Sequence, residues 1–201
     1  MKLDDIKKGF ERISSIMDEK KLYLVELDQQ NGDGDLGISM SDGFRAVLEY
    51  IKVCDTEDIG LFFNAAANYF NEAAPSSLGT VITFIMKGIA KSLKGKTECT
   101  DLEFALAFRS GLENVTNKTG SRPGQKTILD SLTPGVDILV NEDNNPNKWS
   151  IALLAAKTGS ESTKTMRAVW GRAAYYCDNS IGVIDGGSVV GALIFEALVS
   201  K

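Results

Sequence analysis

Three aspartates, Asp28, Asp33 and Asp35, lie close together in a stretch that is also rich in glycine. The Asn-Gly and Asp-Gly steps between them favour tight turns, because Asn, Asp and Gly tolerate positive φ. Such a turn would bring three carboxylates together without a cationic neighbour, and a hard divalent cation would offset their repulsion. Oxygen ligands of this kind suit Mg²⁺ or Ca²⁺ better than zinc. Because Mg²⁺ keeps coordination positions for water and phosphate oxygens, the stretch predicts a magnesium–nucleotide site.

Two other interpretations of these aspartates were weighed. An isolated Asp/Gly loop is more often a solvated acidic turn than a metal site. A calcium-binding EF-hand loop counted from Asn31 would place Asp33 and Asp35 at ligand positions. However, Leu36 stands where that loop needs glycine, and Asp42 stands where it needs glutamate. The calcium loop is therefore disfavoured.

Composition narrows the chemistry that this chain can perform. The 201 residues include no histidine, carry a net charge of −5 and are 43% hydrophobic. The lack of histidine excludes Ser-His-Asp triads, phosphohistidine carriers and His-ligated zinc. The negative charge argues against nucleic acid and anionic membrane surfaces as partners. One globular domain, or at most two small ones, is expected from this length.

The cysteines and the N-terminal residues favour a cytoplasmic protein. Cys54, Cys99 and Cys177 are scattered and form no metal-spaced pair, so reduced thiols are expected. The first residues contain no apolar signal core, and no apolar run is long enough to span a membrane.

Apolar residues recur every three or four positions along most of the chain, which predicts an all-α fold of about eight helices in a single domain, 1–201. Residues 21–27 stay ambiguous between a short strand and a helix. Pro134 and Gly135 are expected to bend or break their helix. Four predicted helices span about 3–19, 40–53, 127–140 and 189–200. Four others are predicted from their starts: they follow the cap at 55–58, the turn at 75–80, the capping box at 100–103 and the start signal at 144–146.

Glycine and hydroxyl residues gather at the predicted helix starts, where backbone N–H groups and the helix dipole favour phosphate. The turn holding Ser76, Ser77, Gly79 and Thr80 could approach a phosphate closely, although a plain helix cap explains it as well. Elsewhere, a fixed Arg172 could pair with phosphate, Asp185 could either cap the last helix or face a nucleotide, and residues 120–126 could cover the nucleotide or merely connect two helices.

Five segments occur together in one order. They are Leu27-Asp28 with Gly32-Asp33-Gly34-Asp35-x-Gly37, then Ser76-Ser77-x-Gly79-Thr80, Gly124-Gln125-Lys126-Thr127-Ile128-x-Asp130, Gly171-Arg172-Ala173-Ala174-Tyr175, and Ser180-Ile181-Gly182 leading to Asp185-Gly186-Gly187. With these segments, the chain resembles the nucleotide-binding L subunit of dihydroxyacetone kinases, the DhaL family, over nearly its whole length.

The resemblance implies an eight-helix antiparallel barrel that binds ADP or ATP at one end through two Mg²⁺ ions. The metal-binding positions of the family match Asp28, Asp33 and Asp35. The expected nucleotide-binding residues are Leu36, Gly37, Ser39, Ser76, Ser77, Gly79, Thr80, Gly120, Ile128, Arg172, Asp185 and Gly187.

Three positions depart from the family pattern. Leu36 replaces a usual histidine, Ser39 replaces a usual asparagine, and Gly186 replaces the proline of the last segment. The serine turn is also shorter than usual, so either Ser76 or Ser77 could match the family serine.

The resemblance further implies a phosphotransferase subunit that is active only with partners. A separate DhaK-like subunit would hold dihydroxyacetone or a related small ketose through its own histidine, in agreement with the absence of histidine here. ADP could be a bound cofactor rephosphorylated by a DhaM-like phosphotransferase-system protein, or ATP could exchange as a substrate. A homodimer is also allowed, and no catalytic base is evident in this chain. The rival hypothesis is a non-catalytic module that senses nucleotide and regulates a partner.

Overall fold

The computed structural model describes residues 1–199. Its regular elements in that range are helices, and the only β pairing there is an isolated antiparallel bridge between Lys2 and Glu98. The α-helices are α1 (Leu3–Glu19), α2 (Lys21–Asp28), α3 (Leu36–Val53), α4 (Ile59–Ala73), α5 (Ser77–Ser92), α6 (Asp101–Thr119), α7 (Leu129–Asn141), α8 (Lys148–Ser162) and α9 (Gly186–Val199). Two 3₁₀ segments, η1 (Thr163–Thr165) and η2 (Arg172–Ser180), separate α8 from α9.

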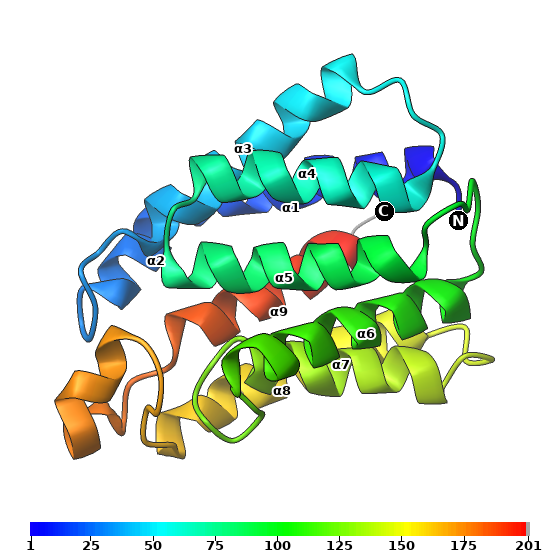
Figure 1. Ribbon diagram of the computed structural model, residues 1–201. Coiled ribbons are helices and arrows are strands. Elements are labelled where there is room, and N and C mark those ends of the chain that lie inside the picture. Colours follow the sequence, from blue (N-terminus) through cyan, green and yellow to red (C-terminus); the bar gives the residue numbers. More distant parts are fainter. Residues whose placement is uncertain (200–201) are drawn as a thin grey trace.

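The long helices form a closed ring. From α3 to α9 each helix packs on the next, and α1 packs on both α3 and α9 (Figure 1). The predicted all-α single domain is confirmed, with the eight long helices α1 and α3–α9 making the ring. The ninth, α2, follows α1 after a break at Lys20 and packs on α3, so the ambiguous residues 21–27 are helical.

The core is one continuous hydrophobic cluster inside the ring. Its largest fully buried side chains include Phe62, Phe70 and Phe195. Helix α9 contributes to this core on several sides, because it packs against α1, α7 and α8. No helix within residues 1–199 combines the length and the apolar character that a membrane crossing requires.

Several predicted caps are present and explain why their helices begin where they do. The Thr100 hydroxyl accepts from the Glu103 N–H at 3.1 Å, while the Glu103 carboxylate accepts from the Thr100 N–H at 2.7 Å. At the start of α4, Asp58 accepts from the N–H of Leu61 at 2.9 Å and from that of Gly95 at 2.8 Å. The bonds from Glu103 and Leu61 satisfy backbone donors that the first turns of α6 and α4 leave free, and the Gly95 bond joins the α5–α6 connection to the start of α4.

The break expected at Pro134 is absent, because α7 runs through it from Leu129 to Asn141. A proline removes one backbone donor, but α7 packs closely on α8, and a Cβ added at Gly159 would lie only 2.0 Å from the Asp130 carbonyl oxygen. Tertiary packing therefore outweighs the single lost hydrogen bond.

Some predicted boundaries shift. Helix α3 begins at Leu36 instead of Met40, and α9 begins at Gly186 instead of Val189. Both starts lie directly after an aspartate of the predicted site. The predicted end of the last helix near Ser200 lies outside the described residues.

Candidate metal and nucleotide site

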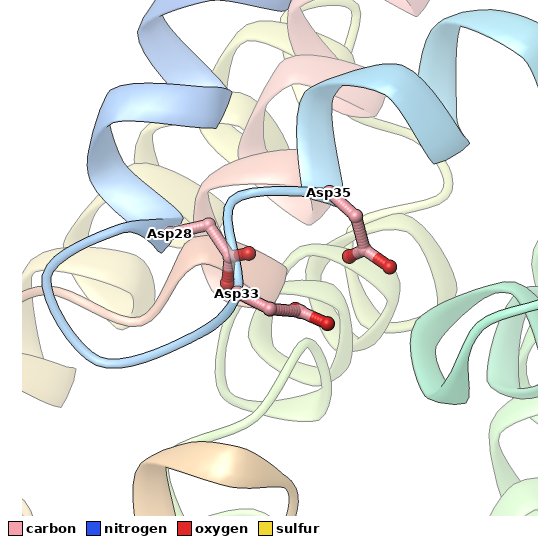
Figure 2. Close-up of side chains that lie close together, drawn as sticks. All are labelled: Asp28, Asp33 and Asp35. Atoms are coloured by element: carbon pink, nitrogen blue, oxygen red, sulfur yellow. The ribbon is translucent and has the colours of Figure 1, made fainter.

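Asp28, Asp33 and Asp35 converge in the loop that joins α2 to α3 (Figure 2). Asp28 is the last residue of α2, and Asp35 directly precedes α3. One carboxylate oxygen from each residue lies within 4.8 Å of the other two. Asp28 is half-buried, whereas Asp33 and Asp35 are exposed. The turn predicted from the sequence therefore does bring these three groups together.

The glycines of this loop are required by its geometry. The Gly34 N–H donates to Asp28 Oδ2 at 2.8 Å, and Gly34 has a φ of 79°, which favours glycine. A Cβ at Gly32 would lie 2.3 Å from Asp28 Oδ1. A larger residue at position 32 would therefore collide with Asp28, and one at position 34 would be strained by the positive φ and would meet Gln29.

The electrostatics of the cluster fit a divalent cation. Burial, followed by the neighbouring charges of Asp33 and Asp28, raises the pKa of Asp35, although Arg172 partly opposes this. Burial is the largest cause of this shift and the two neighbouring carboxylates add to it, and a bound cation would offset both effects. Three oxygen donors in this state match the ligand preference of Mg²⁺.

A cationic neighbour is nevertheless present, contrary to the expectation from the sequence. Arg172 Nη2 of η2 lies 2.5 Å from Asp33 Oδ2. The sequence places these residues far apart, so only the fold shows that they form an ion pair.

A cavity of about 940 Å³ adjoins the aspartates. Cavities of this size commonly hold cofactors and other small ligands. It is formed by the α2–α3 loop, the starts of α5, α7 and α9, and the start of η2. The predicted site residues that line it are Asp28, Asp33, Asp35, Leu36, Ser76, Ser77, Thr80, Ile128, Arg172, Asp185 and Gly187.

Four other predicted nucleotide-binding residues do not line the cavity, namely Gly37, Ser39, Gly79 and Gly120. A Cβ at Gly37 would lie 2.1 Å from the Lys21 carbonyl oxygen, so this glycine permits close packing of α2 on α3. Gly120 ends α6 with a φ of 79°. These glycines have structural roles here, and direct nucleotide contact by any of the four stays a prediction.

The helix starts at the cavity are capped by the predicted side chains. Ser76 Oγ accepts from the Gly79 N–H at 3.0 Å, while Ser77 is exposed beside it. Asp185 Oδ2 accepts from the Ser188 N–H at 2.6 Å. Asp185 thus caps α9 and also lines the cavity, so its two predicted roles are compatible. Burial raises the pKa of Asp185 to about 7.

Two of the departures from the family pattern contact each other. A Cβ at Gly186 would lie 2.5 Å from Leu36 Cδ2. The leucine that replaces the usual histidine therefore fills the space beside the glycine that replaces the usual proline.

Sequence reasoning missed the burial of Lys126 and the contribution of Trp170 to the cavity. Lys126 is 3% exposed, and its Nζ donates to the carbonyl oxygens of Thr163 at 2.7 Å and Val183 at 2.5 Å. Trp170 Nε1 donates to Gln125 Oε1 at 2.6 Å. Lys126 belongs to a segment that the sequence singled out, but lysines are rarely buried, so nothing indicated its position.

Comparisons with known proteins show the family to which the chain belongs. Residues 30–200 match the family described as the DAK2 domain. The chain is 30% identical to the ADP-binding subunit DhaL of the PEP-dependent dihydroxyacetone kinase of Escherichia coli (strain K12), over 94% of this chain and 93% of that protein. It is 29% identical to the ADP-binding subunit DhaL of PEP-dependent dihydroxyacetone kinase 1 of Listeria innocua, over 90% of this chain and 87% of that protein.

A solved structure shares the fold. It is the dihydroxyacetone kinase of C. freundii in complex with AMP-PNP and Mg²⁺, with a TM-score of 0.77 and 20% identity. The match covers 96% of this chain but 33% of that one, so the chain spans about a third of that kinase.

The resemblance drawn from the five sequence segments is confirmed by a family match that covers most of the chain and by relatives matched over nearly their whole length. The chain therefore belongs to the DAK2-domain family, within which it is similar to the DhaL subunits of dihydroxyacetone kinase.

Proposed function

We propose that this protein is the magnesium–nucleotide subunit of a dihydroxyacetone-kinase-like phosphotransferase in the cytoplasm. It would pass a phosphoryl group to dihydroxyacetone or a related small ketose on a separate DhaK-like subunit. The donor would be either ATP that exchanges as a substrate or a retained ADP that a partner rephosphorylates. The observation that carries the proposal is the meeting of three carboxylates at a cavity bordered by helix N-termini. The names of the DhaL relatives, which describe ADP-binding subunits, support the same assignment.

The residues divide the binding work by chemistry. Asp28, Asp33 and Asp35 would hold Mg²⁺ ions, two according to the family resemblance. When bound, Mg²⁺ supplies positive charge against the phosphate oxygens during transfer. The backbone at the starts of α5 and α9 presents N–H groups that favour phosphate, and the Arg172 guanidinium adds a charged donor at the same end of the cavity.

We assign no catalytic base to this chain. Positioning and electrostatic stabilisation do most of the work in phosphoryl transfer. The ketose and the groups that activate its hydroxyl would belong to the DhaK-like partner, and a DhaM-like phosphotransferase-system protein would rephosphorylate the nucleotide if ADP is retained. We therefore expect activity only when partner subunits are added.

The decisive experiment measures phosphoryl transfer to dihydroxyacetone by this protein mixed with a DhaK-like subunit. One reaction contains ATP, and a second contains ADP with phosphoenolpyruvate and the phosphotransferase-system proteins. Turnover in either reaction supports the proposal and identifies the donor. Binding of Mg-ADP or Mg-ATP without turnover with any DhaK-like partner would favour the sensor hypothesis, and absence of binding would reject both.

A variant links the result to the carboxylates. Asp33→Asn should weaken Mg-ADP binding by about tenfold or more in calorimetry, because the ions lose a charged ligand. The matched control is Asp42→Asn, which removes an exposed aspartate that pairs with Arg45. Equal affinities in both variants would remove Asp33 from the site.

A further inference from the structure

The segment Met166–Gly182, here called the lid, joins η1 to α9 and includes η2. It is the orange segment of Figure 1 and lies at the same end of the molecule as the α2–α3 loop. Trp170, Gly171, Arg172 and Ala173 of the lid line the nucleotide cavity. The position of the lid therefore determines where Arg172 lies relative to the metal cluster.

Few contacts hold the lid in place. Within this fully described segment, Ala168 and Ser180 are the only buried residues. Its tip contacts the body through Gln125, which accepts from the Val169 N–H at 3.4 Å and from the Trp170 indole, and through the Arg172–Asp33 ion pair. A segment with so little buried surface has little local stability of its own.

Lys126 joins the two ends of the chain that support the lid. Its Nζ donates to the carbonyl oxygen of Thr163, before the lid, and to that of Val183, after it. The same ends are also connected by the Asp185 N–H, which donates to Thr163 Oγ1 at 2.9 Å. The Gly182 N–H adds a further link, because it donates to the Lys164 carbonyl oxygen at 2.7 Å. Lys126 thus supplies the buried charged link among several bonds that join the chain before the lid to the chain after it.

The backbone around Lys126 is held in a demanding conformation. Lys126 has a φ of 60°, which is uncommon for a residue with a side chain. Asp130 secures this turn, because its carboxylate accepts from the N–H groups of Gly124 and Thr127. Such a backbone persists only where the surrounding structure enforces it.

Burial of the ammonium is itself unfavourable. It lowers the pKa of Lys126, although the charges of Asp185 and Asp130 oppose this. Thr163 is the C-terminal capping position of α8, where the helix dipole favours a cation. Burial of an ammonium without partners would be costly, and the hydrogen bonds to the two carbonyl oxygens offset that cost.

We propose that Lys126 is a positioning residue for the magnesium–nucleotide site: by bridging Thr163 and Val183 it fixes the lid, and the lid places Arg172 at the metal end of the cavity. The part of this inference that concerns nucleotide binding rests on the proposed function. Lys126 also lines the cavity, but both contacts of its Nζ are to protein carbonyl oxygens, so in this proposal it acts through Arg172.

The first experiment requires no ligand. Lys126→Met keeps the apolar stem but removes the donors, and the matched control Lys164→Met removes an exposed lysine that pairs with Glu161 next to the lid. Hydrogen exchange followed by mass spectrometry should show faster exchange across 166–182 in Lys126→Met, with α3–α5 unchanged and the control like the wild type. Unchanged exchange in the lid overturns the proposal. If circular dichroism shows that Lys126→Met unfolds, Lys126→Gln is measured against the same criteria.

The second experiment is a double-mutant cycle on Mg-ADP affinity. Lys126→Met and Arg172→Gln should each weaken Mg-ADP binding by about tenfold. The affinity of the double variant should be close to that of the single variant with the lower affinity. A double variant weakened by the product, about a hundredfold, would mean independent action and would overturn the proposal. If the wild type binds no Mg-ADP, the proposed function fails, while the exchange experiment still decides the role of Lys126.

Discussion

Arg172 and Asp33 form an ion pair with 2.5 Å between Nη2 and Oδ2, although they belong to the lid and to the α2–α3 loop respectively. Asp33 is also an expected magnesium ligand. If Asp33 binds magnesium as proposed, the same carboxylate would face two cations of different origin, one carried by the protein and one supplied by solvent.

This competition predicts opposite effects of one variant. Arg172→Gln should strengthen the binding of Mg²⁺ alone by no more than about threefold, because exposed ion pairs contribute little. The same variant should weaken Mg-ADP binding, because the phosphate loses its guanidinium. Calorimetry with Mg²⁺ and with Mg-ADP measures both affinities. Arg167→Gln, which affects a lid arginine paired with Asp178, serves as control, and a shift of both affinities in one direction would contradict the competition.

Substitutions of the two serines at the start of α5, Ser76 and Ser77, should have different effects. Ser76 Oγ accepts from the Gly79 N–H, so Ser76→Ala should lower the free energy of unfolding by about 1 kcal/mol. Ser77 is exposed at the cavity and caps nothing, so Ser77→Ala should leave stability unchanged and weaken Mg-ADP binding. Urea unfolding and calorimetry on both variants provide the test. A larger stability loss for Ser77→Ala would reverse the assignment.

Gly37 provides a test of indirect effects on the metal site. A Cβ there would lie 2.1 Å from the Lys21 carbonyl oxygen, so α2, which ends at Asp28, would have to move. Gly37→Ala should lower the free energy of unfolding by roughly 1–3 kcal/mol, as overpacking does. It should also weaken the binding of Mg²⁺ alone, because Asp28 would move with α2. Thermal unfolding and Mg²⁺ titration measure these effects, with the exposed neighbour variant Ile38→Ala as control. Wild-type behaviour of Gly37→Ala would show that α2 adapts freely.

The pH dependence of stability should carry a contribution from Asp185. Burial raises the pKa of this group from 3.8 in the unfolded chain to about 7 in the folded one. Folding therefore favours the protonated form, and the resulting stability is complete below about pH 4 and is lost as pH rises through about 7. In metal-free protein, Asp185→Asn should flatten the decline in unfolding free energy between about pH 4 and 7.

Asp58 is the matched control for this measurement. It also caps a helix, but its pKa is lowered because the hydrogen bonds from Leu61 and Gly95 outweigh its partial burial. Its contribution therefore changes only at more acidic pH, and Asp58→Asn should keep the wild-type slope. An unaltered slope in Asp185→Asn would show that Asp185 is ionised throughout this range.

Much of the fold could be predicted because its determinants are local. Periodic apolar residues and the Thr100–Glu103 capping box marked helices that the structure contains. Residues 21–27 were ambiguous because so short a segment shows too few periods to separate helix from strand. The start of α3 at Leu36 was missed because Gly37 and Ser39 are weak helix formers, and tertiary packing on α2 supplies what their propensity lacks.

In the candidate site, too, local features could be predicted from the sequence and contacts between distant elements could not. The aspartates could be grouped from sequence because one short loop carries all three. Ser77, Ile128, Arg172 and Asp185 come from distant elements, so only the family resemblance grouped them before the structure was known. The Arg172–Asp33 pair and the burial of Lys126 depend on how the lid folds back, which no local pattern encodes.

Two walls of the cavity differ in how many contacts anchor them to the core. One wall is the start of α9, a helix embedded in the core. Another is the lid, which carries Trp170 and Arg172 and is anchored by few contacts. A ligand that contacts Arg172 would therefore be held in part by the lid, and displacing the lid would release that contact. Residence time would then be governed by a few hydrogen bonds near Gln125 and Lys126, so small substitutions there could convert a permanently retained cofactor into a rapidly exchanging one.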